Sequence, residues 1–140
     1  MSITVYSANR VTDYNFGSTA YSGGLPATWY VGLSTSTINF DGTGATEPVG
    51  NGYARQALTN NKTNFSTASN GVITNTASGV VTFAESTGFG WGLISYVGLW
   101  DNLTAGNVWW FDALNPSRTV AGLTTVIFAA GAITITFNNT

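Results

Sequence analysis

The chain has 140 residues, of which 44% are hydrophobic and 14% aromatic, while only 7% are charged and the net charge is −2 at neutral pH. Because histidine and cysteine are both absent, imidazole-based catalysis, thiolate nucleophiles, disulfides and histidine- or cysteine-ligated metal sites are excluded. Four basic residues are too few for the basic face that nucleic acids require. We therefore expect no cofactor and no nucleic-acid partner.

The first residues lack the basic-then-apolar order of a signal peptide. The longest apolar stretch, 126–133, is far shorter than the ~18 to 20 residues that cross a bilayer. These features predict synthesis in a cytoplasm and no membrane partner. The low charge has two explanations, since a nearly neutral surface suits either an ordinary globular domain or a protein that works within an assembly.

The length fits one domain, residues 1–140. We expect residues 1–25 to form an N-terminal arm or to contain a short helix. Residues 4–6 have the composition of a short edge strand. Residues 11–16 suit a turn or short helix, which Gly17 would end.

The rest of the chain alternates between short runs of β-branched and aromatic residues and clusters of Gly, Asn, Ser and Pro, which is typical of strands and turns. Residues 60–78 predict a long exposed loop with a hairpin around Asn70-Gly71. This pattern predicts an all-β, single-domain β-sandwich, jelly-roll-like in arrangement. The predicted strands are residues 29–34, 53–59, 80–84, 93–100, 107–114, 124–128 and 133–137.

The most distinctive loop spans residues 41–52 and carries Asp41 and Glu47. It lacks the Lys-Ser/Thr of a phosphate-binding loop and the acidic spacing of a calcium hand. The two carboxylates are candidates to share a surface cation with loop carbonyls. The preferred hypothesis is that Glu47 pairs with Arg55 or accepts loop amide hydrogens, which would pin the loop against the next strand.

A pair of carboxylates about 5 to 9.5 Å apart would suit a glycosidase. Local structure explains the acids equally well, because Asp41-Gly and Asp101-Asn are turn sequences and Glu47-Pro is an extended one. We therefore expect no enzyme activity. The six acids in question are Asp13, Asp41, Glu47, Glu85, Asp101 and Asp112.

Three tryptophans are further site candidates. Trp91 lies between two glycines, which indicates a bulge or a corner. Trp109 and Trp110 are consecutive and would point to opposite faces of a strand. One would then fill the core while the other lay on the outer face, where it could stack on a sugar ring or anchor a protein interface.

Several short motifs resemble small virion structural proteins of tailed bacteriophages, which are variously labelled tail-fibre or head-decoration proteins. The resemblance extends from about residue 17 to near the end of the chain. Its motifs are ATWYVGLS (27–34), DGTG (41–44), TEP (46–48), GYARQ (52–56), VTF (81–83), WG (91–92), VGLWD (97–101), AGN (105–107), AL (113–114) and AGAITI (130–135).

This resemblance implies a phage structural protein. Among such proteins, the absence of catalytic side chains and the low charge favour a non-enzymatic capsid cement or decoration protein. Such a protein would lie on the capsid surface of the virion, bridge major capsid proteins and associate with itself as a dimer or trimer. The alternative is a carbohydrate-binding module of a tail or fibre, used for host attachment. A glycoside-cleaving enzyme is the third hypothesis.

Overall fold

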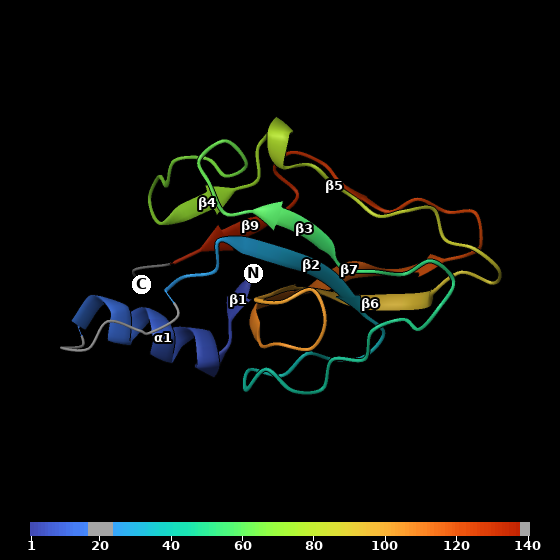
Figure 1. The fold of residues 1–140 in the computed structure, drawn as a ribbon, viewed down its shortest axis with the longest axis horizontal. Helices are drawn as coiled ribbons and strands as arrows, with labels where there is room; N and C mark the ends of the chain where they lie inside the picture. Colours follow the sequence, from blue (N-terminus) through green and yellow to red (C-terminus); the bar gives the residue numbers. More distant parts are fainter. Residues whose placement is uncertain (17–23, 138–140) are drawn as a thin grey trace.

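A computed structural model describes residues 1–16 and 24–137. The protein is all-β, as predicted, with one α-helix and one short 3-10 helix in the described part of the chain (Figure 1). Five antiparallel strands form a sheet in the order β1-β7-β6-β2-β3, and two strand pairs, β4–β9 and β5–β8, complete the fold. The elements are β1 (Ser2–Ile3), α1 (Val5–Phe16), β2 (Thr28–Ser34), β3 (Gln56–Thr59), β4 (Val72–Thr74), the 3-10 helix η1 (Ala77–Gly79), β5 (Val81–Thr82), β6 (Gly92–Trp100), β7 (Val108–Val120), β8 (Ile127–Phe128) and β9 (Thr134–Thr136).

The main core lies between the five-stranded sheet and the two strand pairs. Alternate residues of β2, namely Trp29, Val31 and Leu33, point into it and are almost completely buried. Phe83 and Ile133 enter from the opposite layer. The period-two alternation of the central strands therefore produces a sandwich-like arrangement.

A second, smaller core covers the other face of the sheet. Ile38, from the loop that follows β2, packs there with Trp100, Val108 and Phe111. Phe40 contacts Phe111 edge-to-face at 5.4 Å. Because this face is covered by a loop rather than by strands, polar contacts must hold the loop in place.

The N-terminal prediction was wrong in detail. The edge strand is Ser2–Ile3 rather than residues 4–6, and the helix begins at Val5 rather than at residue 11. Thr4 caps the helix, because its hydroxyl accepts a hydrogen bond from the Ser7 amide at 3.2 Å. The same hydroxyl donates to the Val108 carbonyl at 2.7 Å, which fastens the helix to β7. The predicted end at Gly17 lies outside the described residues.

Residues 60–78 are more ordered than the predicted exposed loop. Phe65 and Asn75 are buried, and β4 within this segment pairs with β9. The predicted hairpin turn is confirmed. Asn70 and Gly71 both have positive φ, at 49° and 74°, as a two-residue type I′ turn requires.

Each of the seven predicted strand segments overlaps an observed strand, but the ends differ. The largest difference is at β7, which continues to Val120 instead of ending near residue 114. Its register with β6 shifts between Ile94 and Tyr96, where residues 114–117 bulge opposite Ser95. This bulge accommodates Pro116 inside a strand that its sequence would otherwise end.

Candidate functional site

Two glycines form a flat floor on the second face of the sheet. Gly32 of β2 lies opposite Gly98 of β6. A Cβ atom on either glycine would come within 2.8 Å or 2.7 Å, respectively, of the Trp100 ring. The indole of Trp100 therefore lies directly over the two glycine backbones, at a distance that no other residue type at these positions would allow.

Arg55 covers the outer face of Trp100. Its guanidinium carbon lies 4.4 Å from the ring centroid, within the range of a cation–π interaction. Arg55 comes directly before β3, and only 8% of it is exposed. A charge this buried must be paired and hydrogen-bonded to be tolerated.

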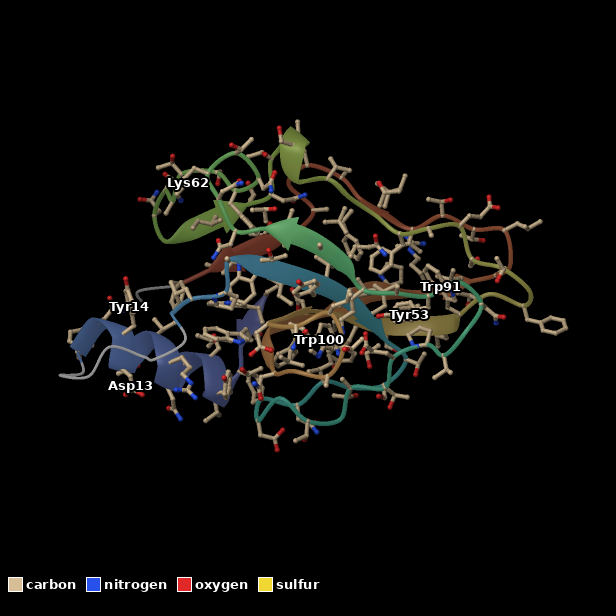
Figure 2. The ribbon with its side chains drawn as sticks, viewed as in Figure 1. Asp13, Tyr14, Tyr53, Lys62, Trp91 and Trp100 are labelled. Carbon is tan, nitrogen blue, oxygen red and sulfur yellow. The ribbon has the colours of Figure 1, made fainter. Side chains whose placement is uncertain are left out.

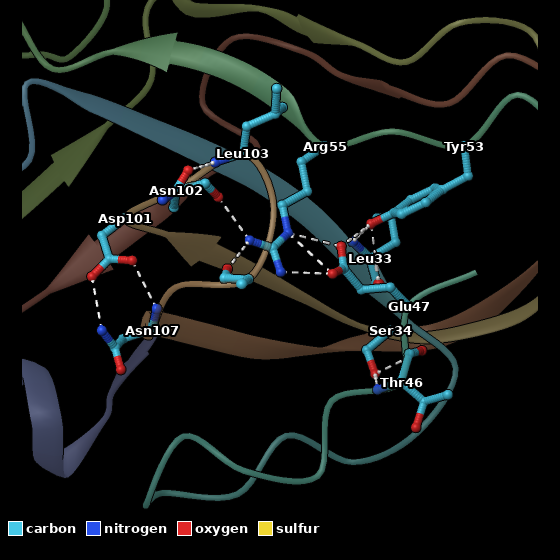
Figure 3. Close-up of polar contacts among 11 residues, drawn as sticks. Leu33, Ser34, Thr46, Glu47, Tyr53, Arg55, Asp101, Asn102, Leu103 and Asn107 are labelled. Atoms are coloured by element: carbon cyan, nitrogen blue, oxygen red, sulfur yellow. Dashed lines mark hydrogen bonds and ion pairs between the residues drawn. The ribbon is translucent and has the colours of Figure 1, made fainter. Parts of the chain in front are cut away.

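Glu47 provides the opposite charge (Figure 3). Arg55 Nη2 donates to Glu47 Oε2 at 2.7 Å, and Nε lies 3.0 and 3.1 Å from the two carboxylate oxygens. Arg55 Nη1 donates to the carbonyls of Asn102 and Ala105 at 2.7 and 2.6 Å. One side chain thus joins the loop that carries Glu47 to the loop between β6 and β7.

Tyr53 completes this group, which we call the Arg55 cluster: Glu47, Tyr53, Arg55 and Trp100. The Tyr53 hydroxyl donates to Glu47 Oε1 at 2.6 Å and accepts a hydrogen bond from the Leu33 amide at 2.8 Å. Burial first, and then the hydrogen bond to the carboxylate, raise the pKa of Tyr53 far above its ordinary value. The tyrosine therefore stays protonated and acts as a donor.

The polar groups of the Arg55 cluster are used in hydrogen bonds to one another and to loop carbonyls. Both oxygens of Glu47 accept hydrogen bonds from Arg55, and one also accepts from Tyr53. The guanidinium bonds two carbonyls as well. The structure thus brings Glu47 and Arg55 together as the preferred hypothesis expected, and that the pair pins the loop remains a prediction.

Asp101 was considered as a turn residue and as one of six acids for a carboxylate pair, and in the structure it organises the loop after β6. Its carboxylate accepts hydrogen bonds from the Asn107 amide at 2.7 Å and from Trp109 Nε1 at 3.1 Å. The sequence could have indicated this role, because Asp101 directly follows the predicted strand 93–100 and Trp109 lies near the start of the next predicted strand, 107–114. Trp109 is thereby satisfied at its one polar atom, although its ring is buried.

Asp41 lies apart from the Arg55 cluster. It is fully exposed, and one of its oxygens accepts hydrogen bonds from the amide and the hydroxyl of Thr43. The hydroxyl bond, and then the amide bond, lower the pKa of Asp41 below its ordinary value. Asp41 forms a local turn of the Asx type.

The prediction for Trp109 and Trp110 was wrong, since neither lies on the outer face. They are 2% and 5% exposed, and both belong to the main core. The register between β6 and β7 shifts at this point, where Leu99 pairs with Trp110 and Trp100 with Val108. A bulge adds one residue to β7 and breaks the alternation, so two consecutive indoles share a face.

Trp91 is also buried, at the corner that its flanking glycines predicted. Its ring contacts Tyr53 and Phe83 edge-to-face, and its Nε1 donates to the Asn51 carbonyl at 2.9 Å. All five tryptophans are therefore core residues. The flat aromatic platform expected for sugar stacking is absent from the described tryptophans.

Large apolar side chains are exposed elsewhere on the surface. Figure 2 shows the side chains around the fold. Val49 is 94% exposed, Phe89 98% and Leu123 77%. Phe89 and Leu123 lie on turns, and Val49 directly precedes one. The segments that carry Phe89 and Leu123 are neighbours, because the Leu123 amide donates to the Ser86 carbonyl at 2.8 Å. Exposed apolar groups that gather in one place mark an interaction surface.

Within the described part of the chain, no group of three or more acidic, histidine or cysteine side chains is placed to hold a metal ion. Among the same residues, no helix has the length and apolar character needed to cross a membrane.

Fold and site together define a small all-β domain whose polar clusters fasten its own loops and whose exposed turns carry apolar side chains. The chain belongs to the family of podophage GP4 fiber I protein gp80, whose profile matches residues 2–136. It is therefore a phage virion structural protein, as its motifs indicated. No curated protein matches the chain.

Proposed function

We propose that the protein is a non-enzymatic structural subunit of a virion fibre, which acts by binding neighbouring protein subunits. The observation that carries this proposal is the exposure of Val49, Phe89 and Leu123 on a surface with very few charges. Apolar groups without competing charges are the composition of an interface centre. The family description supports a place in a fibre.

The carboxylates support a role without catalysis. Glu47 and Asp101 are held by hydrogen bonds that fasten loops, and Asp41 is held by Thr43. Asp13, Glu85 and Asp112 are exposed side chains. A glycosidase keeps one carboxyl group protonated through its environment, whereas Glu47, Asp101 and Asp41 accept hydrogen bonds from donors that hold their loops.

The carbohydrate-binding alternative loses its main support, because it depended on an exposed tryptophan. Every tryptophan is at most 7% exposed. Stacking on a sugar ring requires an open aromatic face. A fibre subunit that binds protein is therefore favoured over one that binds a glycan.

A capsid cement protein is the second candidate. It is favoured by exposed apolar side chains in distant parts of the fold, such as Phe16 at the end of α1 and Phe89 in the loop before β6. A protein that bridges neighbouring major capsid proteins needs at least two separate contact surfaces. Both candidates are structural and both require binding to other subunits of the particle.

The copy number in purified particles tests the proposal. We expect quantitative mass spectrometry to find the protein in the virion, at a ratio to the major shell protein set by the few symmetric positions of a tail. Hundreds of copies per particle would contradict the fibre position and support the cement role. Absence from purified particles would overturn both.

A further inference from the structure

Three loop segments meet at one end of the molecule and carry three highly exposed apolar side chains. We call Val49, Phe89 and Leu123 the distal tip. Hydrogen bonds join the turns: the Thr87 amide donates to the Asn51 carbonyl at 2.9 Å, and the Leu123 amide donates to the Ser86 carbonyl at 2.8 Å. The tip is therefore a rigid part of the fold rather than a set of independent loops.

The backbone of the distal tip is shaped to hold these side chains outward. Phe89 lies between Gly88 and Gly90, whose φ angles are +55° and +78°, conformations that glycine adopts readily. Leu123 itself has a φ of +61°, which is rare for a leucine. Strained residues persist where the surrounding structure holds them, and they cluster at functional positions.

An apolar groove lies between α1 and the β4–β9 pair. We call it the aromatic groove; it has a volume of about 400 Å³. Asn60, Asn61 and Lys62 lie along its rim. Leu25 and Phe137 are the exposed apolar side chains of its lining, while Trp29, Phe65, Trp109 and Trp110, which also line it, are at most 7% exposed.

The distal tip and the aromatic groove lie at opposite ends of the long axis of the molecule. In Figure 1, α1 and β4 are at the left, and the loops before β6 and after β7 reach the far right. When two copies align along this axis, the distal tip of one copy faces the aromatic groove of the next. The two surfaces in contact are then different parts of the chain. Such contacts repeat from copy to copy and build a ring or an open filament.

We propose that the distal tip of one copy inserts into the aromatic groove of the next copy, so that the chain assembles head to tail. This inference deepens the proposed fibre function and rests on it. The occupant is a second copy because the same chain supplies both an exposed apolar projection and an apolar hole large enough for a phenylalanine side chain. Pockets of about 300 to 1,000 Å³ hold drug-sized ligands, which are larger than one phenylalanine side chain.

The charges agree with this contact. The turns that form the distal tip, residues 49–52, 86–90 and 121–124, contain no ionisable side chain. The one ionisable residue among those named for the groove is Lys62, whose ammonium group donates to the Ser66 carbonyl at 3.2 Å on the exposed rim. Insertion of the tip therefore buries no unpaired charge, which would oppose association.

Cysteine cross-linking tests the contact directly, because the chain has no native cysteine. Two double variants place one thiol on the tip and one on the groove rim, and both keep Phe89 itself: Thr87→Cys, at an exposed position of the tip, with Lys62→Cys, and Thr87→Cys with Leu25→Cys. Under oxidation at high concentration, we expect the double variants to form a ladder of disulfide-linked oligomers. The single variants Lys62→Cys and Leu25→Cys should stay uncross-linked.

Two results would overturn the proposal. Efficient dimer formation by Thr87→Cys alone would show that two tips meet each other, and monomers only in both double variants would show that tip and groove do not meet. Sedimentation of the cysteine-free chain gives an independent measure. We expect Phe89→Ser to weaken self-association about tenfold or more, as for a central interface residue.

Phe40→Ser is the matched control for sedimentation, because Phe40 is also exposed, at 66%, and belongs to neither surface. It should leave self-association unchanged. These experiments use the isolated chain in solution, whereas the fibre function is tested by the content of the virion. A negative result for the head-to-tail contact can therefore be distinguished from a negative result for the fibre function.

Discussion

At the scale of single residues, Arg55 determines how two loops are held. Its guanidinium lies between the Trp100 ring and the Glu47 carboxylate and also bonds two loop carbonyls. A planar, five-donor group suits this position, and an ammonium group would not reproduce it. The sequence predicted the partner of Arg55 but gave no indication of the glycine floor beneath Trp100, because the two glycines are far apart in the chain.

Glu47→Gln should destabilise the fold by about 3 kcal/mol, because it leaves a buried guanidinium without its opposite charge. Urea unfolding followed by tryptophan fluorescence measures the change. Asp41→Asn is the control, and it should leave the unfolding midpoint where it is, since Asp41 is fully exposed. An unchanged midpoint for Glu47→Gln would mean that the pair does not pin the loop.

Gly98→Ala should lower the free energy of unfolding by about 2 kcal/mol, because the new methyl group would overlap the Trp100 ring. Gly50→Ala is the comparison. Gly50 has open space around it and a φ of +72°, so only backbone strain of about 1 kcal/mol applies. Equal losses measured by thermal unfolding would contradict a role for Trp100 packing on the glycine floor.

Alkaline pH should destabilise the protein through Tyr53. Its pKa is raised in the folded state, so the unfolded chain loses its proton first as the pH rises above about 10. The stabilisation is complete below that pH and is lost progressively above it, by up to about 1.4 kcal/mol per pH unit. Tyr53→Phe should remove this slope from the unfolding free energy measured between pH 9 and pH 11, and an identical slope in both proteins would contradict the assignment.

At the scale of elements, the sequence predicted strands well where alternation is regular, as in residues 29–34 and 93–100. It failed where one residue interrupts the pattern. The bulge at Trp109 reverses the face of the next residue, and the bulge of residues 114–117 lets β7 continue past a proline. A bulge depends on the partner strand, so the strand's own residues do not reveal it.

The start of the N-terminal helix was predicted too late in the chain for a related reason. Residues 4–6 have strand-like side chains, but the Thr4 hydroxyl caps a helix and bonds β7 at the same time. The contact with β7 spans more than a hundred residues of sequence. The tertiary contact therefore outweighed the local strand propensity of residues 4–6.

Thr4→Ala should destabilise the protein by about 2 kcal/mol, because it removes the helix cap and leaves the buried Val108 carbonyl without this donor. The loss should appear in circular dichroism as reduced helix signal as well as a lower melting temperature. Thr12→Ala is the control, since its hydroxyl bonds the Ala8 carbonyl on an exposed part of α1. Equal effects of the two changes would contradict the capping role.

At the scale of the whole molecule, the low charge and the exposed apolar turns have one explanation. A protein with few charges has little electrostatic repulsion between copies, and its exposed apolar groups favour contact with other subunits. The composition alone left open whether the chain was an ordinary domain or part of an assembly. The position of the exposed apolar side chains depends on where the turns lie in the folded chain. The sequence did not reveal that three of these segments meet at one end of the molecule.

The most direct test is an electron cryo-microscopy reconstruction of the intact virion at a resolution that shows side chains. Our account predicts density for this chain in a fibre, with Phe89 enclosed by a neighbouring subunit. Particles in which the chain is missing, or in which it is present with the distal tip facing open solvent, would contradict the view that it works by adhesion.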